Sequence, residues 1–460
     1  MDAVHGHGPH GSGSENRRDR VLVVGAGSSG LAAAKNLRER GFVVDLVERD
    51  AAIGGNWNID ADRSRVYDST HMISSKPFTQ FPDFPMPDGD PDYLHHTQVR
   101  AYLERYAAHF GLDDRVELHT EVVSCRPLAT AGWRVTLDDG ASHSTRDYGH
   151  LVVANGHNWS PKWPSYPGQT QFTGELLHAA DHRRADRFDG RRVVVVGAGN
   201  TGCDLAVESA QRATATYHST RRAYWYAPKY AFGRPSDQVS DLIFSLRLPM
   251  RITQALFQTT ARLTVGRHER FGLPSPDHRF LETHPIVNQQ LLYYVGHGAV
   301  TPVGDIARFE GDEVVFTDGT RVTADLVVFA TGYLIRLPFL PDDALPGEPG
   351  RPRLYRNLLH PDRGDISVVG LIQPDSGQFC LVHWQTVLLA RFLELQCLDP
   401  GAADEFLSTA RGRLDERSLD GLALLDSTRH YVEVEHAQYI RALADDIREL
   451  EARLATAVAA

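Results

Sequence analysis

Residues 21–30 read VLVVGAGSSG, and residues 193–202 read VVVVGAGNTG. In each stretch a continuous apolar run leads into a glycine-rich turn of the form GxGxxG. Such runs are typical of the central strands of a parallel sheet, because these strands are buried on both faces. In the turn, the first glycine permits a tight bend, the second lets the backbone approach a pyrophosphate, and the third lets helix and strand pack closely. The two stretches therefore predict two dinucleotide-binding units.

The residues after the first turn complete one such unit. LAAAKNLRERG at 31–41 carries apolar residues at helical spacing and stops at Gly41, and FVVDLVERD at 42–50 indicates the next strand. Glu48 stands at the end of that strand, eighteen residues beyond Gly30. A carboxylate at this place accepts hydrogen bonds from both hydroxyls of an adenosine ribose. We expect this first unit to bind a dinucleotide through its pyrophosphate and its adenosine ribose.

The second unit differs at the end of its second strand. ATATYHSTRR at 213–222 ends in Ser219, Thr220, Arg221 and Arg222, with no acidic residue among them. Hydroxyl and guanidinium groups suit a ribose 2′-phosphate, so the second nucleotide is predicted to be NADPH. The alternative is that these residues form a solvated basic corner of the surface.

Two dinucleotides in one chain imply that electrons pass from NADPH to a flavin and then to an acceptor. Disulfide reductases of this layout need a redox cysteine pair. The four cysteines are far apart and form neither a CxxC pair nor a metal-binding spacing, so we expect no metal site: they are Cys125, Cys203, Cys380 and Cys397. Oxygen remains the common acceptor.

Composition restricts the partners and the compartment. The chain has 460 residues and a net charge of −11, which argues against nucleic acid as a main partner. No apolar run is long enough to span a membrane. The first 20 residues lack the apolar core of a secretory signal, and their histidines lie among Gly, Pro and Ser, as in a disordered tail. We expect a cytoplasmic protein.

The order of the strands predicts an α/β fold with two Rossmann-like domains, the NADPH domain being inserted into the FAD domain. The apolar runs LVVANG, DLVVFATGY and ISVVGL, at 151–156, 325–333 and 366–371, indicate further strands. The predicted boundaries are a disordered tail (1–19), the first part of the FAD domain (20–170), the NADPH domain with a helical insertion around 230–300 (171–325), and the second part of the FAD domain with a C-terminal helix (326–460).

Over roughly residues 20–400 the chain resembles the flavin-containing monooxygenases, a class B flavoprotein family. Any one matching motif is modest evidence, but all of them occur in the family's order. Besides the two glycine turns they are IGGNW (53–57), SSKPFTQFPDFPMP (74–87), ANGH (154–157), FTGELLH (172–178), GLPSPDHRF (272–280) and ATGY (330–333).

The resemblance implies an NADPH- and O2-dependent monooxygenase of the N,N-dimethylaniline type. Such an enzyme oxygenates a nucleophilic nitrogen or sulfur of a small molecule through a C(4a)-hydroperoxyflavin, which the bound nicotinamide shields from water. Its partners would be an amine or sulfide and O2. Three alternatives stay open: Baeyer–Villiger oxidation of a ketone, an NADPH oxidase with weak coupling, and a non-enzymatic protein with a flavin fold.

Two residues depart from the family pattern. The full motif around FTGELLH runs on to residue 182 and reads FTGELLHAADH in this chain. The family normally has Tyr or Phe at the position of His182, and the Baeyer–Villiger enzymes have Trp there. Many members also have an asparagine where this chain has Ile73, and isoleucine donates no hydrogen bond. If Ser74 does not replace that asparagine, the enzyme is expected to leak hydrogen peroxide when its substrate is missing.

The predicted site residues follow from the motifs and the resemblance. Ser74 and His178 are the catalytic candidates, although His178 is better suited to holding the domain junction. Trp57 either packs on the flavin or fills the core, Asp204 either binds nucleotide or fixes its helix, and Gln373 lies in a loop that reaches the flavin or the surface. The cofactor-binding set is Gly25, Gly27, Ser28, Ser29, Gly30, Glu48, Asn56, Trp57, Ser74, Val122, Gln373, Gly197, Gly199, Asn200, Thr201, Gly202, Asp204, Ser219, Thr220, Arg221 and Arg222. A homodimer is possible through the terminal helix or the insertion.

Overall fold

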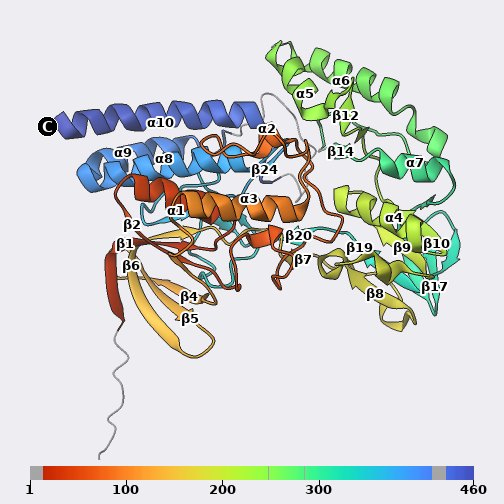
Figure 1. The fold of residues 1–460 in the computed structure, drawn as a ribbon, viewed down its shortest axis with the longest axis horizontal. Coiled ribbons are helices and arrows are strands. Elements are labelled where there is room, and N and C mark those ends of the chain that lie inside the picture. The colour runs from red at the N-terminus through yellow and green to blue at the C-terminus, as the bar shows by residue number, and fades with distance from the viewer. Residues whose placement is uncertain (1–13, 247, 284, 417–430, 460) are drawn as a thin grey trace, which may run out of the picture.

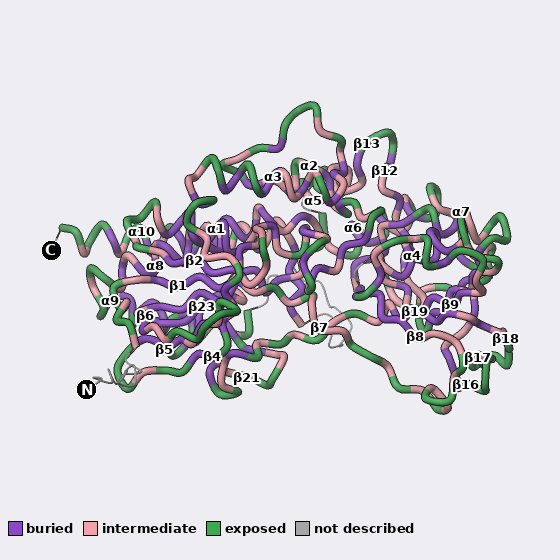
Figure 2. The backbone as a smooth tube through the Cα atoms, turned by 60° about the horizontal axis from the view of Figure 1, so that its bottom comes forward, coloured by how far each residue is buried: buried purple, intermediate pink, exposed green. Residues whose placement is uncertain are grey.

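The computed structural model describes residues 14–246, 248–283, 285–416 and 431–459. Two α/β domains lie side by side in the view of Figure 1, each with its own sheet and its own covering helices. Buried backbone fills the centre of each domain in Figure 2. The predicted fold class, with two dinucleotide-binding domains, is confirmed.

The first domain is built on a seven-stranded mixed sheet. Strands β1, β2, β3 and β23 are parallel to their neighbours, and β4, β5 and β6 form an antiparallel extension. The VLVV run is almost fully buried, as expected for a central strand. The strands, in sheet order, are β3 (Val116–Glu117), β2 (Val43–Val47), β1 (Glu15–Val24), β6 (His143–Val153), β5 (Trp133–Asp138) and β4 (Glu121–Pro127), with β23 (Ile366–Val368) paired to β6.

Helices from three distant parts of the chain cover one face of this sheet (Figure 1). The largely apolar segment FCLVHWQTVLLARFLELQCL, which also carries Arg391 and Glu394, forms a helix that is buried nearly all round because neighbouring helices enclose it. The predicted C-terminal helix is present and packs on it. The covering helices are α1 (Ser28–Glu39), α3 (His96–His109), α8 (Phe379–Leu398), α9 (Pro400–Gly412) and α10 (His436–Ala459), and the short α2 (Lys76–Thr79) lies near them.

The second domain contains a five-stranded parallel sheet and a smaller antiparallel one. The VVVV run is its central strand β9, buried as predicted. The parallel strands, in sheet order, are β15 (Thr301–Val303), β10 (Ala215–Ser219), β9 (Arg192–Val196), β19 (Leu326–Phe329) and β8 (Glu175–His178). The antiparallel strands are β16 (Ile306–Glu310), β17 (Glu313–Phe316) and β18 (Arg321–Thr323), and the helices are α4 (Asn200–Arg212) and α7 (Gln290–Gly296).

Two predicted boundaries need correction. Residues 15–19, assigned to a disordered tail, begin β1, where Glu15 and Arg17 pair with β6; residues 1–13 lie outside the described part. The run at 326–329, assigned to the returning FAD domain, is β19 of the second sheet. Its four residues are all buried between β8 and β9, so the second domain extends past Phe329. The FAD domain resumes only after that strand, and β23 completes its sheet.

The helical insertion predicted around 230–300 is present; in the view of Figure 1 it lies above the second domain's sheet and reaches towards the first domain. Its two longer helices are α5 (Ser236–Ser245) and α6 (Met250–Thr264). Within the described residues, none of the helices is both long and apolar enough to cross a membrane. Short paired strands complete the fold: β11 (Tyr226–Ala227) with β14 (Ile286–Val287), β12 (Tyr230–Ala231) with β13 (Arg234–Pro235), β21 (Gly347–Glu348) with β22 (Arg351–Pro352), and β24 (Gln373–Pro374) with β25 (Glu433–Val434).

The chain passes between the domains along two adjacent strands. β7 (Ser160–Pro161) carries it outward and β20 (Tyr333–Leu334) carries it back, and the two pair in antiparallel fashion. Lys162 reinforces this connection, because its N–H donates to the Gly332 carbonyl at 3.0 Å and its own carbonyl accepts from Thr331 Oγ1 at 2.6 Å. The two crossings therefore act as one narrow ribbon.

Candidate active site

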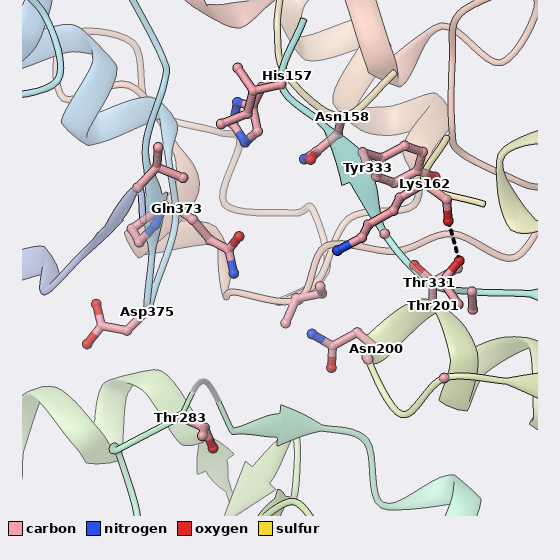
Figure 3. Close-up of a pocket in the computed structure, with 18 of the residues that line it drawn as sticks. His157, Asn158, Lys162, Asn200, Thr201, Thr283, Thr331, Tyr333, Gln373 and Asp375 are labelled. Atoms are coloured by element: carbon pink, nitrogen blue, oxygen red, sulfur yellow. Dashed lines mark hydrogen bonds between the residues drawn. The ribbon is translucent and has the colours of Figure 1, made fainter. Parts of the chain in front are cut away.

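A cavity of about 1530 Å³ lies between the two domains and is shown in Figure 3. Residues 197–201 of the second glycine turn form part of one wall. Ile73, Ser74 and Gln373 of the first domain form part of another. Side chains predicted for different cofactors therefore open onto one space, which is the arrangement that electron transfer between the cofactors requires.

Different physical constraints act on the three glycines of the first turn. Gly25 has φ +102°, and a Cβ there would lie 2.8 Å from the Ala154 carbonyl oxygen. A Cβ on Gly30 would lie 1.7 Å from the Gly25 carbonyl oxygen, so helix α1 packs on the turn only if residue 30 is glycine. A Cβ on Gly27 would meet only Gly55, at an ordinary 3.5 Å. The protein's packing does not demand glycine at 27, whereas a ligand pressed against the backbone does.

Glu48 braces the same turn from the end of β2. Its carboxylate accepts the Ala26 N–H at 2.7 Å and the Asp50 N–H at 2.9 Å. Burial raises the pKa of Glu48, and these two backbone hydrogen bonds oppose the shift. Each carboxylate oxygen keeps a further lone pair, so the group can still accept ribose hydroxyls. Ser28 and Ser29 open α1, whose N-terminus has no side-chain cap.

The glycines of the second turn are constrained in the same way. A Cβ on Gly197, at φ +116°, would lie 2.4 Å from the Ala330 carbonyl oxygen, and one on Gly202 would lie 1.9 Å from that of Gly197. A Cβ on Gly199 would meet no protein atom within 4 Å. Gly199 also precedes α4, whose N-terminus has no side-chain cap. The open space at Gly199 and the uncapped helix fit a pyrophosphate.

The basic end of β10 faces the same cavity. Arg221 and Arg222 are exposed and line it, as do Asn200 and Thr201. Ser219 also contributes to the wall, although its hydroxyl donates to the Gly304 carbonyl at 2.8 Å. Thr220 is buried and is absent from the lining. Two guanidinium groups are therefore available to a phosphate, and Thr220 supports the strand end.

Two residues of the site belong to none of the sequence motifs: one lines the cavity, and the other supports the second glycine turn from below. Lys162 lines the cavity, and its side chain in Figure 3 lies between Tyr333 and Asn200. His218 is fully buried beneath the turn, where its Nε2 lies 3.0 Å from the Gly197 carbonyl oxygen and donates to it. Burial lowers the pKa of His218 to about 4, so the imidazole is neutral at pH 7. The sequence carries no distinct signal for His218, because its strand reads ATYHS and also contains a polar threonine and a polar serine.

His178 lies at the junction and lines the cavity, but both of its nitrogens face protein groups. Nδ1 accepts the Ala180 N–H at 3.0 Å, and Nε2 lies 3.5 Å from Thr331 Oγ1. The ring also contacts Trp163 and Tyr333. Burial lowers its pKa. This geometry suits a residue that holds the ribbon between the domains.

The loop at 73–75 meets the insertion at the cavity wall. Ile73 is 42% exposed and Ser74 is half-buried, and both line the cavity. Ser75 lies behind them and donates its backbone N–H and its hydroxyl to the Asp237 carboxylate, the latter at 2.8 Å. Asp237 belongs to α5, so the insertion is fastened to this loop. Burial raises the pKa of Asp237.

The wall around Gln373 carries acidic groups. Gln373 lines the cavity, while its N–H donates to the Val432 carbonyl at 2.8 Å. Asp375 also lines the cavity and accepts the His436 N–H at 2.9 Å (Figure 3). Asp375 is exposed within the cavity, where the surrounding protein and the charge of Glu435 raise its pKa to about 7.

Twelve of the 21 predicted cofactor residues do not line this cavity: Gly25, Gly27, Ser28, Ser29, Gly30, Glu48, Asn56, Trp57, Val122, Gly202, Asp204 and Thr220. The four that lie outside the two glycine turns and the ends of β2 and β10 contact other parts of the protein. Asn56 is exposed and accepts the Arg65 N–H at 2.8 Å, and Trp57 packs partly buried against the first domain's core. Val122 belongs to the apolar core beside the first sheet. Asp204 is bonded to Tyr67 and Asn288, and burial raises its pKa to about 6. The contacts of Asp204 favour the helix-fixing alternative.

Comparison with known proteins agrees with this arrangement. The family model described as flavin-binding monooxygenase-like matches residues 18–452. Human flavin-containing monooxygenase 5 is 31% identical over 453 residues, which cover 93% of this chain and 82% of the human protein. The dimethylaniline monooxygenase (N-oxide-forming) 2 of Rattus norvegicus is 31% identical over 398 residues, covering 83% and 74%. The S-allyl-L-cysteine S-oxygenase from Allium sativum has a similar structure, with a TM-score of 0.67 at 20% identity over 96% of this chain and 92% of that one.

The residues of both glycine turns fit dinucleotides, because Gly27 and Gly199 leave space that the protein itself does not fill. The match over nearly the whole chain shows that the protein belongs to the flavin-binding monooxygenase-like family, as a flavin-dependent monooxygenase whose cofactors are FAD and NADPH.

Proposed function

We propose that the protein oxygenates a nucleophilic nitrogen or sulfur atom of a small molecule, with NADPH as reductant and O2 as oxidant. The observation that carries this proposal is the shared cavity, onto which the second glycine turn and the Ile73–Ser74 loop both open. Nitrogen oxygenation is supported by the related rat protein, whose name describes it as N-oxide-forming.

The nucleotide domain is proposed to bind NADPH through three groups of residues. The turn at 197–202 and the N-terminus of α4 hold the pyrophosphate. Arg221 and Arg222 hold the 2′-phosphate, since guanidinium groups match phosphate geometry. Lys162 adds a positive charge from the opposite side of the cavity, so the bound nucleotide also contacts the ribbon between the domains.

The first domain is proposed to hold FAD through the turn at 25–30 and Glu48. Bound FAD supplies the redox chemistry, since it accepts two electrons from NADPH and activates O2 for transfer of one oxygen atom to the substrate. Ser74 and Gln373 provide the polar contacts in the facing wall, while Ile73 provides an apolar surface that repels water. His178 holds the junction and exchanges no proton, because both of its nitrogens are engaged.

The experiment that tests this proposal measures NADPH and O2 consumption by the FAD-loaded protein with a panel of tertiary amines, sulfides and ketones. Products are identified by mass and by connectivity. The expected result is N-oxide or sulfoxide formation at one oxygen atom per NADPH. Ester or lactone products from ketones alone would replace the proposal with Baeyer–Villiger oxidation, and peroxide alone with every substrate would indicate an oxidase.

Two proposals concern the surroundings of the protein. A cytoplasmic location is supported by the four cysteines, which all lie among the described residues and form no disulfide there. A homodimer is supported by exposed apolar side chains on the insertion, among them Leu242, Ile252 and Leu263. Light scattering on the purified protein tests the second: a mass of one chain would refute the dimer.

A further inference from the structure

A short segment of the first domain, residues 67–70, reaches across to the nucleotide domain. The Tyr67 ring is 4% exposed and belongs to that domain's apolar core, together with Leu177 and Phe188. The Asp68 N–H donates to the Arg183 carbonyl at 2.9 Å. These contacts lie outside the β7–β20 ribbon and form a second connection, from the first domain to the core of the nucleotide domain, whereas the Ser75–Asp237 contact reaches only the helical insertion.

Side chains of this segment form hydrogen bonds with two carboxylates of helix α4. Asp204 and Glu208 are four residues apart and therefore lie on the same face of the helix. The Tyr67 hydroxyl donates to Asp204 Oδ2 at 2.9 Å, and the Ser69 hydroxyl donates to the Glu208 carboxylate. Asn288 donates to the other Asp204 oxygen at 2.7 Å. Because α4 begins at the second glycine turn, whatever holds α4 also holds the nucleotide's pyrophosphate site.

His182 joins the same cluster. It is fully buried, and its Nε2 lies 2.9 Å from Glu208 Oε2, to which it donates. Its ring stacks on Phe188 at 4.9 Å and meets the edge of Tyr67 at 5.6 Å. The other ring nitrogen, Nδ1, has no hydrogen-bond partner among the described residues. His182 therefore keeps the aromatic packing expected at this motif position and adds a donor that orients Glu208.

We propose that Tyr67, Ser69 and His182 are positioning residues, which act through Asp204 and Glu208 to fix α4 relative to the FAD domain. The β7–β20 ribbon is narrow, and a narrow ribbon on its own lets two domains rotate about it. The Ser75–Asp237 contact fastens the insertion to the first domain, whereas the 67–70 segment fastens α4 itself. The second connection therefore sets the position of the pyrophosphate site relative to the FAD domain, and with it the geometry across which hydride passes from NADPH to FAD. The kinetic consequence of this inference rests on the proposed function, whereas the contacts between the segment and α4 are independent of it.

The test uses the FAD-loaded protein and the variants Tyr67→Phe, Ser69→Ala and their combination. Phenylalanine keeps the ring in the core and removes only the hydroxyl, so the fold is retained. Tyr294→Phe is the matched control, because the Tyr294 hydroxyl also bonds to α4, accepting from Gln211 Nε2 at 2.9 Å, but does so within the nucleotide domain.

The first readout is hydrogen exchange at the backbone amides of α4 and of residues 67–70. We expect faster exchange at both places in the double variant and at α4 alone in the control. The second readout is anaerobic flavin reduction at saturating NADPH, which should slow by about tenfold in the double variant while NADP+ affinity changes by less than about threefold. The control should reduce its flavin at close to the wild-type rate.

Each outcome decides the inference. Unchanged exchange at residues 67–70 would overturn it, whatever the kinetics. Faster exchange with an unchanged reduction rate, or an equal fall in rate in Tyr294→Phe, would also overturn the positioning role, since the cluster would then be merely structural. If the wild-type flavin is not reduced by NADPH but exchange rises at both places, the second connection stands and the proposed function fails.

Discussion

At the scale of single residues, Ile73 is the largest departure from the family pattern. Its side chain is 42% exposed and lines the cavity next to Ser74, so it stands where a reactive oxygen species would need protection. Isoleucine donates no hydrogen bond, and the neighbouring Ser75 is already committed to Asp237. Ser74 is therefore the residue of this loop that is left to replace the hydrogen bonds of an asparagine amide, and one hydroxyl donates fewer hydrogen bonds than an amide NH2 group does.

We accordingly expect the wild-type enzyme to release hydrogen peroxide when NADPH and O2 are present without substrate. Ile73→Asn should lower the peroxide formed per NADPH by about threefold or more, because an amide donor returns to the wall. Ile73→Leu is the control and should leave the yield unchanged. Peroxide is measured with a peroxidase-coupled assay. A wild-type yield close to zero would contradict this prediction.

We propose that Arg221 and Arg222 decide which nicotinamide cofactor binds. Both are exposed in the cavity at the end of β10, where the extra phosphate of NADPH would lie. Replacing both with Gln should weaken NADP+ binding by about 30-fold, while NAD+ binding changes by less than about threefold. Arg126→Gln, which removes one positive charge at an exposed position on β4, is the control for loss of surface charge away from the cavity. Binding is measured by calorimetry. Equal changes in affinity for both nucleotides would show that the arginines do not recognise the 2′-phosphate, and no change for either would show that they form a solvated corner.

At the scale of elements, the apolar runs and their glycine turns predicted the strand–turn–helix units correctly. VLVV and VVVV became central strands, and the helices after them begin within the turns. The supports beneath the turns were not predictable, because the partners of a buried polar group depend on strand pairing. His218 shows this: in the sequence it is one of several polar residues of β10, and only the fold places it under Gly197.

The support from His218 makes the second turn sensitive to pH. Its folded-state pKa is about 4, against 6.5 for a free histidine, so between these values the unfolded chain binds more protons. Its contribution to stability is complete above pH 6.5 and is lost as pH falls towards 4. The advantage in melting temperature of wild type over His218→Gln should therefore shrink between pH 7 and pH 5. A difference that stays constant with pH would contradict this.

At the scale of the whole molecule, the insertion of one domain into the other was predictable from the two glycine turns and the returning strand β23. The boundary at 326 was misplaced because an apolar run does not reveal which sheet it joins, and β19 joins the second. The contacts of Tyr67 and Ser69 with α4 join residues 137 and 139 positions apart. Local periodicity carries no information on such pairs, so only the structure identifies this second connection between the domains.

The central claim is that a flavin in the first domain receives electrons from NADPH in the second. The most direct measurement is anaerobic stopped-flow absorbance of the FAD-loaded protein mixed with NADPH or with NADH. The predicted result is rapid bleaching of the flavin by NADPH, with an efficiency at least about tenfold above that with NADH. A protein that binds no flavin, or whose flavin is reduced equally well by NADH, would contradict it.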